Sequence, residues 1–305
     1  MILLWGITTD RPLELVRTAL QRMNAPLVFL NQQSLLQSRI DVTVGKRLRG
    51  NLRTQAWSAA LESMTAVYLR PYDARRMAAL EDAQPKSSKF QHAFGFEDAL
   101  MSWIEMAPAL VVNRPSAMAS NNSKPYQLQL IRSAGFDVPE TLVTTDPKAA
   151  VEFWERHGSV IYKSISGVRS IVAKLGPEHH DRMEDIAHCP TQFQQYIKGT
   201  DFRVHIVGGE VFSCEISSTA DDYRYPQMRD EQVRVRSCEV PQNVSDRCRE
   251  LAASMKLFVA GIDLRRTPSG EWYCFEVNPS PGFSFYEEAT GQPISEAVAR
   301  LLTQS

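Results

Sequence analysis

Two oxygen-bearing side chains near the end of the chain are the first candidates for chemistry. Glu276 and Asn278 stand two residues apart in residues 272–279, an apolar stretch that is typical of a β-strand. Successive strand residues face opposite sides, so Glu276 and Asn278 should share one face, with Phe275 and Val277 on the other. A carboxylate and a carboxamide suit a hard cation, Mg2+ in particular when phosphates fill its remaining coordination positions.

A second strand, predicted over residues 259–264, supplies a third oxygen donor. The turn-rich segment 266–270 connects it to the first strand, so the two strands should pair as a hairpin. Asp263 would then lie close to Glu276 and Asn278. The residues alone leave an alternative open, a hairpin whose solvated face carries ordinary acidic residues.

A lysine followed by a loop of small residues indicates a phosphate site. Lys163 ends an apolar strand over residues 160–163, and residues 164–170 contain serines, a glycine and an arginine. Small residues let consecutive backbone N–H groups converge on one anion, and the lysine adds a positive charge. The loop has neither the Walker nor the Rossmann glycine spacing. A plain β-hairpin turn with a basic surface residue is the alternative.

The segment 201–207 alternates strictly and predicts a strand with Phe202, Val204 and Ile206 inside. Arg203 and His205 then share its other face. Gly208-Gly209 is a hairpin signal, and we expect Glu215 on the returning strand to lie on the face of Arg203. The polar stretch 217–230 that follows is long enough for a functional loop.

Composition excludes several classes of protein. The 305 residues include 34 basic and 35 acidic side chains, for a net charge of −1, so nucleic acid and membrane surfaces are not expected partners. Five dispersed cysteines predict a reducing cytoplasm without disulfides or a zinc site. No run is long enough for a transmembrane helix.

Strands alternate with helical stretches over residues 1–112, which predicts a small α/β layer. Within it, the basic stretch 46–53 is expected on a loop or an edge. We interpret it as a solvated surface, with a dock for an acidic partner as the alternative.

The order of these segments resembles the ATP-grasp superfamily over residues 113–305, preceded by a pre-ATP-grasp α/β domain over residues 1–112. The implied fold class is α/β (α+β), with a lid-bearing subdomain over 113–197 and a metal and substrate subdomain over 198–305. Within the superfamily, the chain is similar to the RimK-like ligases and to the graspetide synthetases, the microviridin-type enzymes that cyclise peptides. The segments that carry the resemblance are GIDLRRTPSGEWYCFEVNPSPG, FYEEATGQPISEAVARLL, SNNSKPYQLQLIRSAGFDVPETLVTTD and YKSISGVRS.

The resemblance assigns roles to individual residues. Asp263, Glu276 and Asn278 would ligate two Mg2+ ions, with Mn2+ as a substitute. Arg203 and Arg224 would steady the transferred phosphate or the acceptor. The residues that would hold ATP are Lys124, Lys163, the mobile loop with Ser164, Gly167 and Arg169, the connector residues Gln195, Tyr196 and Ile197, and Asp201 at the ribose.

The implied activity is a carboxylate–amine or carboxylate–alcohol ligase that works through an acyl phosphate. Its acceptor would be a peptide or an amino-acid-like molecule, and a precursor peptide would make it a macrocyclase. Ligases of this type are commonly dimers or tetramers, so a homo-oligomer is compatible. Two alternatives remain: a kinase on the same fold, and a regulatory protein that binds nucleotide without turnover.

Overall fold

The chain begins with a sheet of four parallel strands in the order β2-β1-β6-β7. The structure, a computed structural model, describes residues 1–77, 80, 84, 86–165, 172–217 and 233–304. The strands are β1 (Ile2–Gly6), β2 (Leu27–Asn31), β6 (Ala66–Arg70) and β7 (Leu110–Val112). Because successive residues of β1 face opposite sides, a helix packs on each face of the sheet. Ile2 and Leu4 pack with α1 (Arg11–Arg22), whereas Leu3 and Trp5 pack with α2 (Ser88–Met106).

A second, smaller sheet corrects part of the expectation for the basic stretch: residues 46–48 lie in a loop as predicted, whereas residues 49–53 do not. Its strands are β3 (Arg39–Thr43), β4 (Arg49–Arg53) and β5 (Ser58–Ala60), in that order. Residues 49–53 therefore form the central strand, neither a loop nor an edge. Leu52 faces the core and is fully buried, while Arg49 and Arg53 alternate outward into solvent. This strand was not predicted because its charged residues obscured the few residues that face the core.

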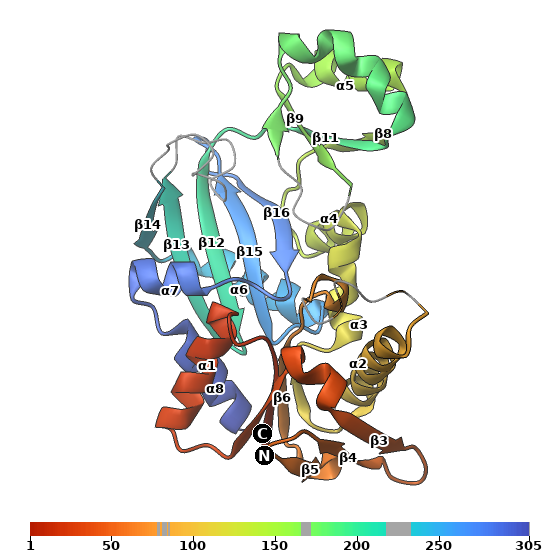
Figure 1. The fold of residues 1–305 in the computed structure, drawn as a ribbon. Coiled ribbons are helices and arrows are strands. Elements are labelled where there is room, and N and C mark those ends of the chain that lie inside the picture. The colour runs from red at the N-terminus through yellow and green to blue at the C-terminus, as the bar shows by residue number, and fades with distance from the viewer. Residues whose placement is uncertain (78–79, 81–83, 85, 166–171, 218–232, 305) are drawn as a thin grey trace.

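The unit built from residues 141–195 stands apart from the first sheet, at the top of Figure 1. Its sheet has the order β10-β9-β11-β8. Its elements are β8 (Thr141–Thr144), α5 (Pro147–His157), β9 (Val160–Ser164), β10 (Ala173–Lys174), the 3-10 segment η6 (Pro177–His188) and β11 (Thr191–Gln195). One face packs Phe193 against α5 and η6. Lys163 and Gln192 are cross-strand partners and lie on the other face.

The largest sheet is antiparallel, with the order β14-β13-β12-β15-β16. Its strands are β12 (Thr200–Val207), β13 (Glu210–Ser217), β14 (Arg234–Ser237), β15 (Val259–Arg266) and β16 (Trp272–Asn278). Phe202, Val204 and Ile206 pack with α4 (Lys124–Ser133) and α6 (Gln242–Ser254), which confirms the predicted inner face. Helix α7 (Ser284–Thr290) lies over the opposite face (Figure 1), where Tyr286 packs with Cys214.

The hairpin of β12 and β13 has a register that the sequence interpretation missed. Val207 pairs with Glu210 across the two-residue turn, and this places Cys214 opposite Arg203 and Glu215 opposite Phe202. Cross-strand partners share a face, so Glu215 lies on the side of Phe202. The expectation that Glu215 shares the face of Arg203 was wrong, because a hairpin register is fixed by its turn. Glu215 instead lies 3.6 Å from Arg236 of β14.

Asn113 joins the first sheet to the largest one. It follows β7, is buried, and donates from Nδ2 to the carbonyls of Val259 (2.6 Å) and Pro279 (2.7 Å). Its Oδ1 accepts from the backbone N–H groups of Phe258 (2.8 Å) and Val259 (3.2 Å). One amide side chain thus satisfies backbone groups at the start of β15 and just after β16.

The remaining helices complete the packing. They are α3 (Pro115–Met118), α8 (Ile294–Thr303) and the 3-10 segments η1 (Gln32–Gln37), η2 (Leu61–Ser63), η3 (Ala74–Arg76) and η5 (Ala119–Asn122). Helix α8 lies beside α1 (Figure 1), so the end of the chain shares a core with its beginning. Within the described ranges, no helix combines the length and apolar character needed to span a bilayer.

Candidate active site

Strands β15 and β16 bring the three predicted metal ligands together. Asp263 pairs directly with Glu276, and Asn278 pairs with Gly261, two residues before Asp263. The Asp263 and Glu276 side chains are 19% and 21% exposed, so they are half-buried but still reachable. Nowhere in the described ranges do three His, Cys, Asp or Glu side chains gather as a metal site. Two carboxylates and an amide fit a Mg2+ ion whose other positions are filled by phosphates and water.

A β-bulge sets the direction of these ligands. The register shifts between Asp263 and Leu264, so β16 carries one additional residue at that point. Cys274 and Val277 are fully buried in the core, while Phe275 is only partly buried and lies 5.3 Å from the Arg265 guanidinium. Val277 takes the predicted face. Phe275 does not, because strict alternation fails at a bulge.

Each carboxylate has a basic neighbour. Lys124, the first residue of α4, lies with its Nζ 3.3 Å from Glu276 Oε1. Arg203 of β12 donates from Nη1 to Asp263 Oδ1 over 2.6 Å. Gln127 holds α4 in place through bonds to the N–H (3.0 Å) and carbonyl (2.7 Å) of Val277. The arrangement places positive charge beside both carboxylates, as a site for a nucleoside triphosphate requires.

Lys163 lies on the face of the β10-β9-β11-β8 sheet that is opposite α5 and η6. Its Nζ donates to Gln194 Oε1 over 3.4 Å, and Gln194 Nε2 donates to Thr141 Oγ1 over 3.0 Å. Ser164 ends β9. Three further predicted site residues lie outside the described residues: Gly167, Arg169 and Arg224. Their roles stay predictions.

The connector between the two sheets is fastened by Arg265, a residue that the sequence interpretation missed. Arg265 binds both Asp201 oxygens, at 2.7 and 2.8 Å, and the Ile197 carbonyl at 2.7 Å. The Tyr196 ring centroid lies 4.8 Å from Lys174 Nζ and 5.7 Å from Arg265 Cζ. Asp201, predicted at the ribose, therefore also anchors the connector.

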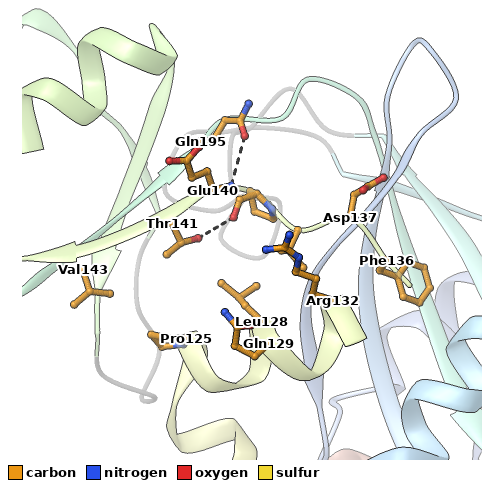
Figure 2. Close-up of a pocket in the computed structure, with 12 residues that line it drawn as sticks. Pro125, Leu128, Gln129, Arg132, Phe136, Asp137, Glu140, Thr141, Val143 and Gln195 are labelled. Carbon is orange, nitrogen blue, oxygen red and sulfur yellow. Dashed lines mark hydrogen bonds between the residues drawn. The ribbon is translucent and has the colours of Figure 1, made fainter. Parts of the chain in front are cut away.

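A cavity of about 730 Å³ opens between α4 and β8, beside the connector (Figure 2). Leu128 and Arg132 line it from α4, Thr141 and Val143 line it from β8, and Gln195 closes one side. Gln195 Oε1 accepts from the Glu140 N–H at 3.5 Å. The predicted metal ligands are not among its described lining residues, so this cavity borders the candidate site without containing it.

His205 lies beside Arg203 and is buried. Burial lowers the pKa of His205 well below its ordinary value, and the Arg203 charge lowers the pKa further. Arg203 Nε donates to His205 Nε2 over 3.4 Å, which requires a neutral ring. The predicted alternation put His205 and Arg203 on one face of the strand but did not indicate this contact. The glycine at position 261 was the available signal, because a glycine inside a strand often marks a close approach by other atoms.

Comparison with known proteins agrees with this geometry. Residues 119–302 match the model of the RimK-like ATP-grasp domain. The ribosomal protein bS6–L-glutamate ligase of Escherichia fergusonii is 28% identical over 218 residues, which cover 66% of this chain and 70% of the ligase.

Two solved structures resemble almost the whole chain. Macrocyclase MdnC of Microcystis aeruginosa, bound to precursor peptide MdnA, has a TM-score of 0.83 and 22% identity, with full coverage (100%) of both chains. The ATP-grasp ligase PsnB, complexed with a minimal precursor, Mg and ADP, has a TM-score of 0.80 and 26% identity over 99% of this chain and 96% of PsnB. The chain belongs to the RimK-like ATP-grasp family of ligases, whose cofactors are ATP and Mg2+.

Proposed function

We propose that this protein joins a carboxylate of a peptide to an amine or a hydroxyl group, at the expense of ATP. The observation that carries this proposal is the pairing of Asp263 with Glu276, each with a basic side chain beside it, in a chain of the RimK-like family. A peptide substrate is supported by the whole-chain likeness to PsnB, which was solved with a minimal precursor. A precursor peptide is therefore the first substrate to test.

The reaction has two balanced steps. A substrate carboxylate attacks the γ-phosphorus of ATP, which gives an acyl phosphate and releases ADP. An amine or hydroxyl then attacks the acyl carbon, so that phosphate leaves and a proton is lost from the nucleophile. The product is lighter than its parts by one water, and a macrocycle forms when both groups belong to one peptide.

The residues of the site divide this work. Lys124 and Lys163 offset the charge of the nucleotide phosphates, and Arg203 orients the phosphate that is transferred. Asp263, Glu276 and Asn278 would hold two divalent cations, which supply charge neutralisation at the phosphates. Asn278 Oδ1 accepts from the Ser280 N–H at 2.9 Å, and its second lone pair suits a metal. Mn2+ should substitute for Mg2+, because both take oxygen ligands.

The proposal includes the domain boundaries, the cellular location and the oligomeric state. The chain divides at residues 112 and 113 into a pre-ATP-grasp and an ATP-grasp domain, and the latter divides at residues 197 and 198. We infer a cytoplasmic location from the dispersed cysteines and leave the homo-oligomer as a state to be measured by light scattering.

The test is release of ADP by the full chain with Mg2+ and ATP, across amino acids, dipeptides and candidate precursor peptides, with product masses. The proposal expects ADP only with certain acceptors, together with a product that has lost one water. A product heavier by one phosphate identifies a kinase instead. Binding of ATP without turnover on any acceptor favours the regulatory alternative.

A further inference from the structure

The guanidinium of Arg203 is held on several sides. The residue is 5% exposed, although its charge would ordinarily keep it in water. Nη1 donates to Asp263 at 2.6 Å, Nε donates to His205 Nε2 at 3.4 Å, and the Tyr286 ring centroid lies 5.5 Å away. Two bonds from different nitrogens of a planar group fix its plane, not only its position.

Gly261 provides the space for this group. It lies on β15 opposite His205, two pairs along from the pair of Arg203 and Asp263. A Cβ atom at position 261 would collide with Nη2 and Cζ of Arg203. The guanidinium therefore lies directly against the strand backbone, and every other residue type would push it away.

His205 and Tyr286 contact each other as well as Arg203. Their ring centroids are 5.0 Å apart in an edge-on arrangement. Helix α7 carries Tyr286, so the packing of α7 on the sheet reaches Arg203 through two aromatic rings. The bond from Nε needs a lone pair on Nε2, which only a neutral ring with its proton on Nδ1 provides.

We propose that His205, Gly261 and Tyr286 form a cradle that positions Arg203 for the phosphate transferred from ATP. This inference rests on the proposed function and names positioning residues for its central arginine. His205 acts as a hydrogen-bond acceptor, Gly261 as the space, and Tyr286 as the cover. Their loss should weaken contacts to the transferred phosphate while leaving the hold on ADP intact.

The first measurement is the hydrogen bond itself. In the 15N-labelled full chain, NMR should find a scalar coupling between Arg203 Nε and His205 Nε2, with the His205 proton on Nδ1. Gly261→Ala should abolish the coupling, because the added methyl group displaces the guanidinium. Absence of the coupling in the wild-type chain, or a proton on Nε2, overturns the assignment of His205.

The second measurement separates ADP from the transferred phosphate. Calorimetry gives the affinity for ADP with Mg2+ alone and with Mg2+ plus fluoroaluminate, a mimic of the phosphoryl group in transfer. In His205→Phe and Gly261→Ala, the gain from fluoroaluminate should fall about tenfold or more, with ADP affinity within about twofold of wild type. His205→Gln keeps an acceptor at the same reach and should recover most of the gain.

Two controls make the result specific. Phe212→Leu alters the buried cross-strand partner of His205 on β13 and should lower the melting temperature without changing the fluoroaluminate gain. In an Arg203→Lys background, His205→Phe should add nothing further, because both changes act through one side chain.

The outcomes are distinguishable. An unchanged fluoroaluminate gain in both cradle variants, or a Gln variant no better than Phe, overturns the cradle. A wild-type chain that binds no ADP contradicts the proposed function instead, and the nitrogen coupling then decides on the cradle alone. If His205→Phe does not fold, the Gln and Gly261→Ala variants carry the comparison.

Discussion

Lys124 and Glu276 form an ion pair, with 3.3 Å between Nζ and Oε1, that joins the first residue of α4 to the last strand of the sheet. Arg203 and Asp263 repeat this relationship on the neighbouring strand, at 2.6 Å. A divalent cation must therefore share its carboxylates with two basic groups. Nucleotide phosphates arriving with the cation offer those groups new charged partners, which couples metal and nucleotide binding.

Lys163→Ala should weaken binding of Mg2+–ADP by about 10- to 100-fold, the usual worth of a hydrogen bond to a charged group. Lys163 lies on the face of the β10-β9-β11-β8 sheet that is opposite α5 and η6. Lys148→Ala is the matched control, since Lys148 lies on α5 with its side chain 84% exposed. Calorimetric titration checks both variants. Equal affinities for the two would remove Lys163 from the nucleotide site.

Arg265→Lys should lower the free energy of unfolding by about 2 kcal/mol and weaken nucleotide binding, because lysine lacks the planar fork that holds Asp201 and Ile197. Arg266→Lys, an exposed change one residue along, should leave both properties unaltered. Chemical denaturation and titration with ADP measure the two effects. Identical behaviour of the variants contradicts an anchoring role for Arg265.

Asn113→Ala should lower the free energy of unfolding by about 3 kcal/mol, because backbone groups of Val259 and Pro279 lose their buried partners. The exposed Asn243→Ala serves as the matched substitution on α6. Thermal unfolding compares the pair. A loss below about 1 kcal/mol would show that the clamp between the sheets contributes little.

The depressed pKa of His205 predicts a pH dependence of stability. The unfolded histidine has a pKa near 6.5, whereas burial and Arg203 lower the folded pKa well below that value. The unfolded state therefore binds the proton first as pH falls. The contribution of neutral His205 to the free energy of unfolding is complete above about pH 6.5 and declines below it.

Relative to His205→Gln, the wild-type chain should lose about 1.4 kcal/mol of unfolding free energy per pH unit until the folded pKa is reached. Denaturation of both proteins from about pH 8 to about pH 5 measures the difference. Parallel curves would mean that His205 titrates alike in both states.

The sequence predicted the strands of the site better than their registers. Alternation in residues 201–207 identified the inner face correctly, because that face packs on α4 and α6. The residue across from Arg203 was mispredicted. A shift of one residue in the hairpin register places Cys214, and not Glu215, on the face of Arg203. The bulge at Asp263 was likewise invisible, because residue types do not show where a strand gains a residue.

Contacts between distant segments were also beyond prediction. Asn113 and Arg265 read as ordinary polar residues, and their importance comes from backbone groups about 146 and 68 positions away. The β3–β5 sheet was missed because charged residues on its exposed face obscured the few apolar residues that face the core. Gly261 was a position where the residue type itself signalled a close approach.

The most direct test of the metal and nucleotide site is the affinity for ADP with and without Mg2+, in the wild-type chain and in Glu276→Gln. The wild-type affinity should rise about tenfold or more with Mg2+, and Glu276→Gln should lose most of that gain while it melts normally. Glu271→Gln, an exposed change before the same strand, should keep the gain. A Mg2+ effect that is absent, or equal in wild type and Glu276→Gln, would contradict the site.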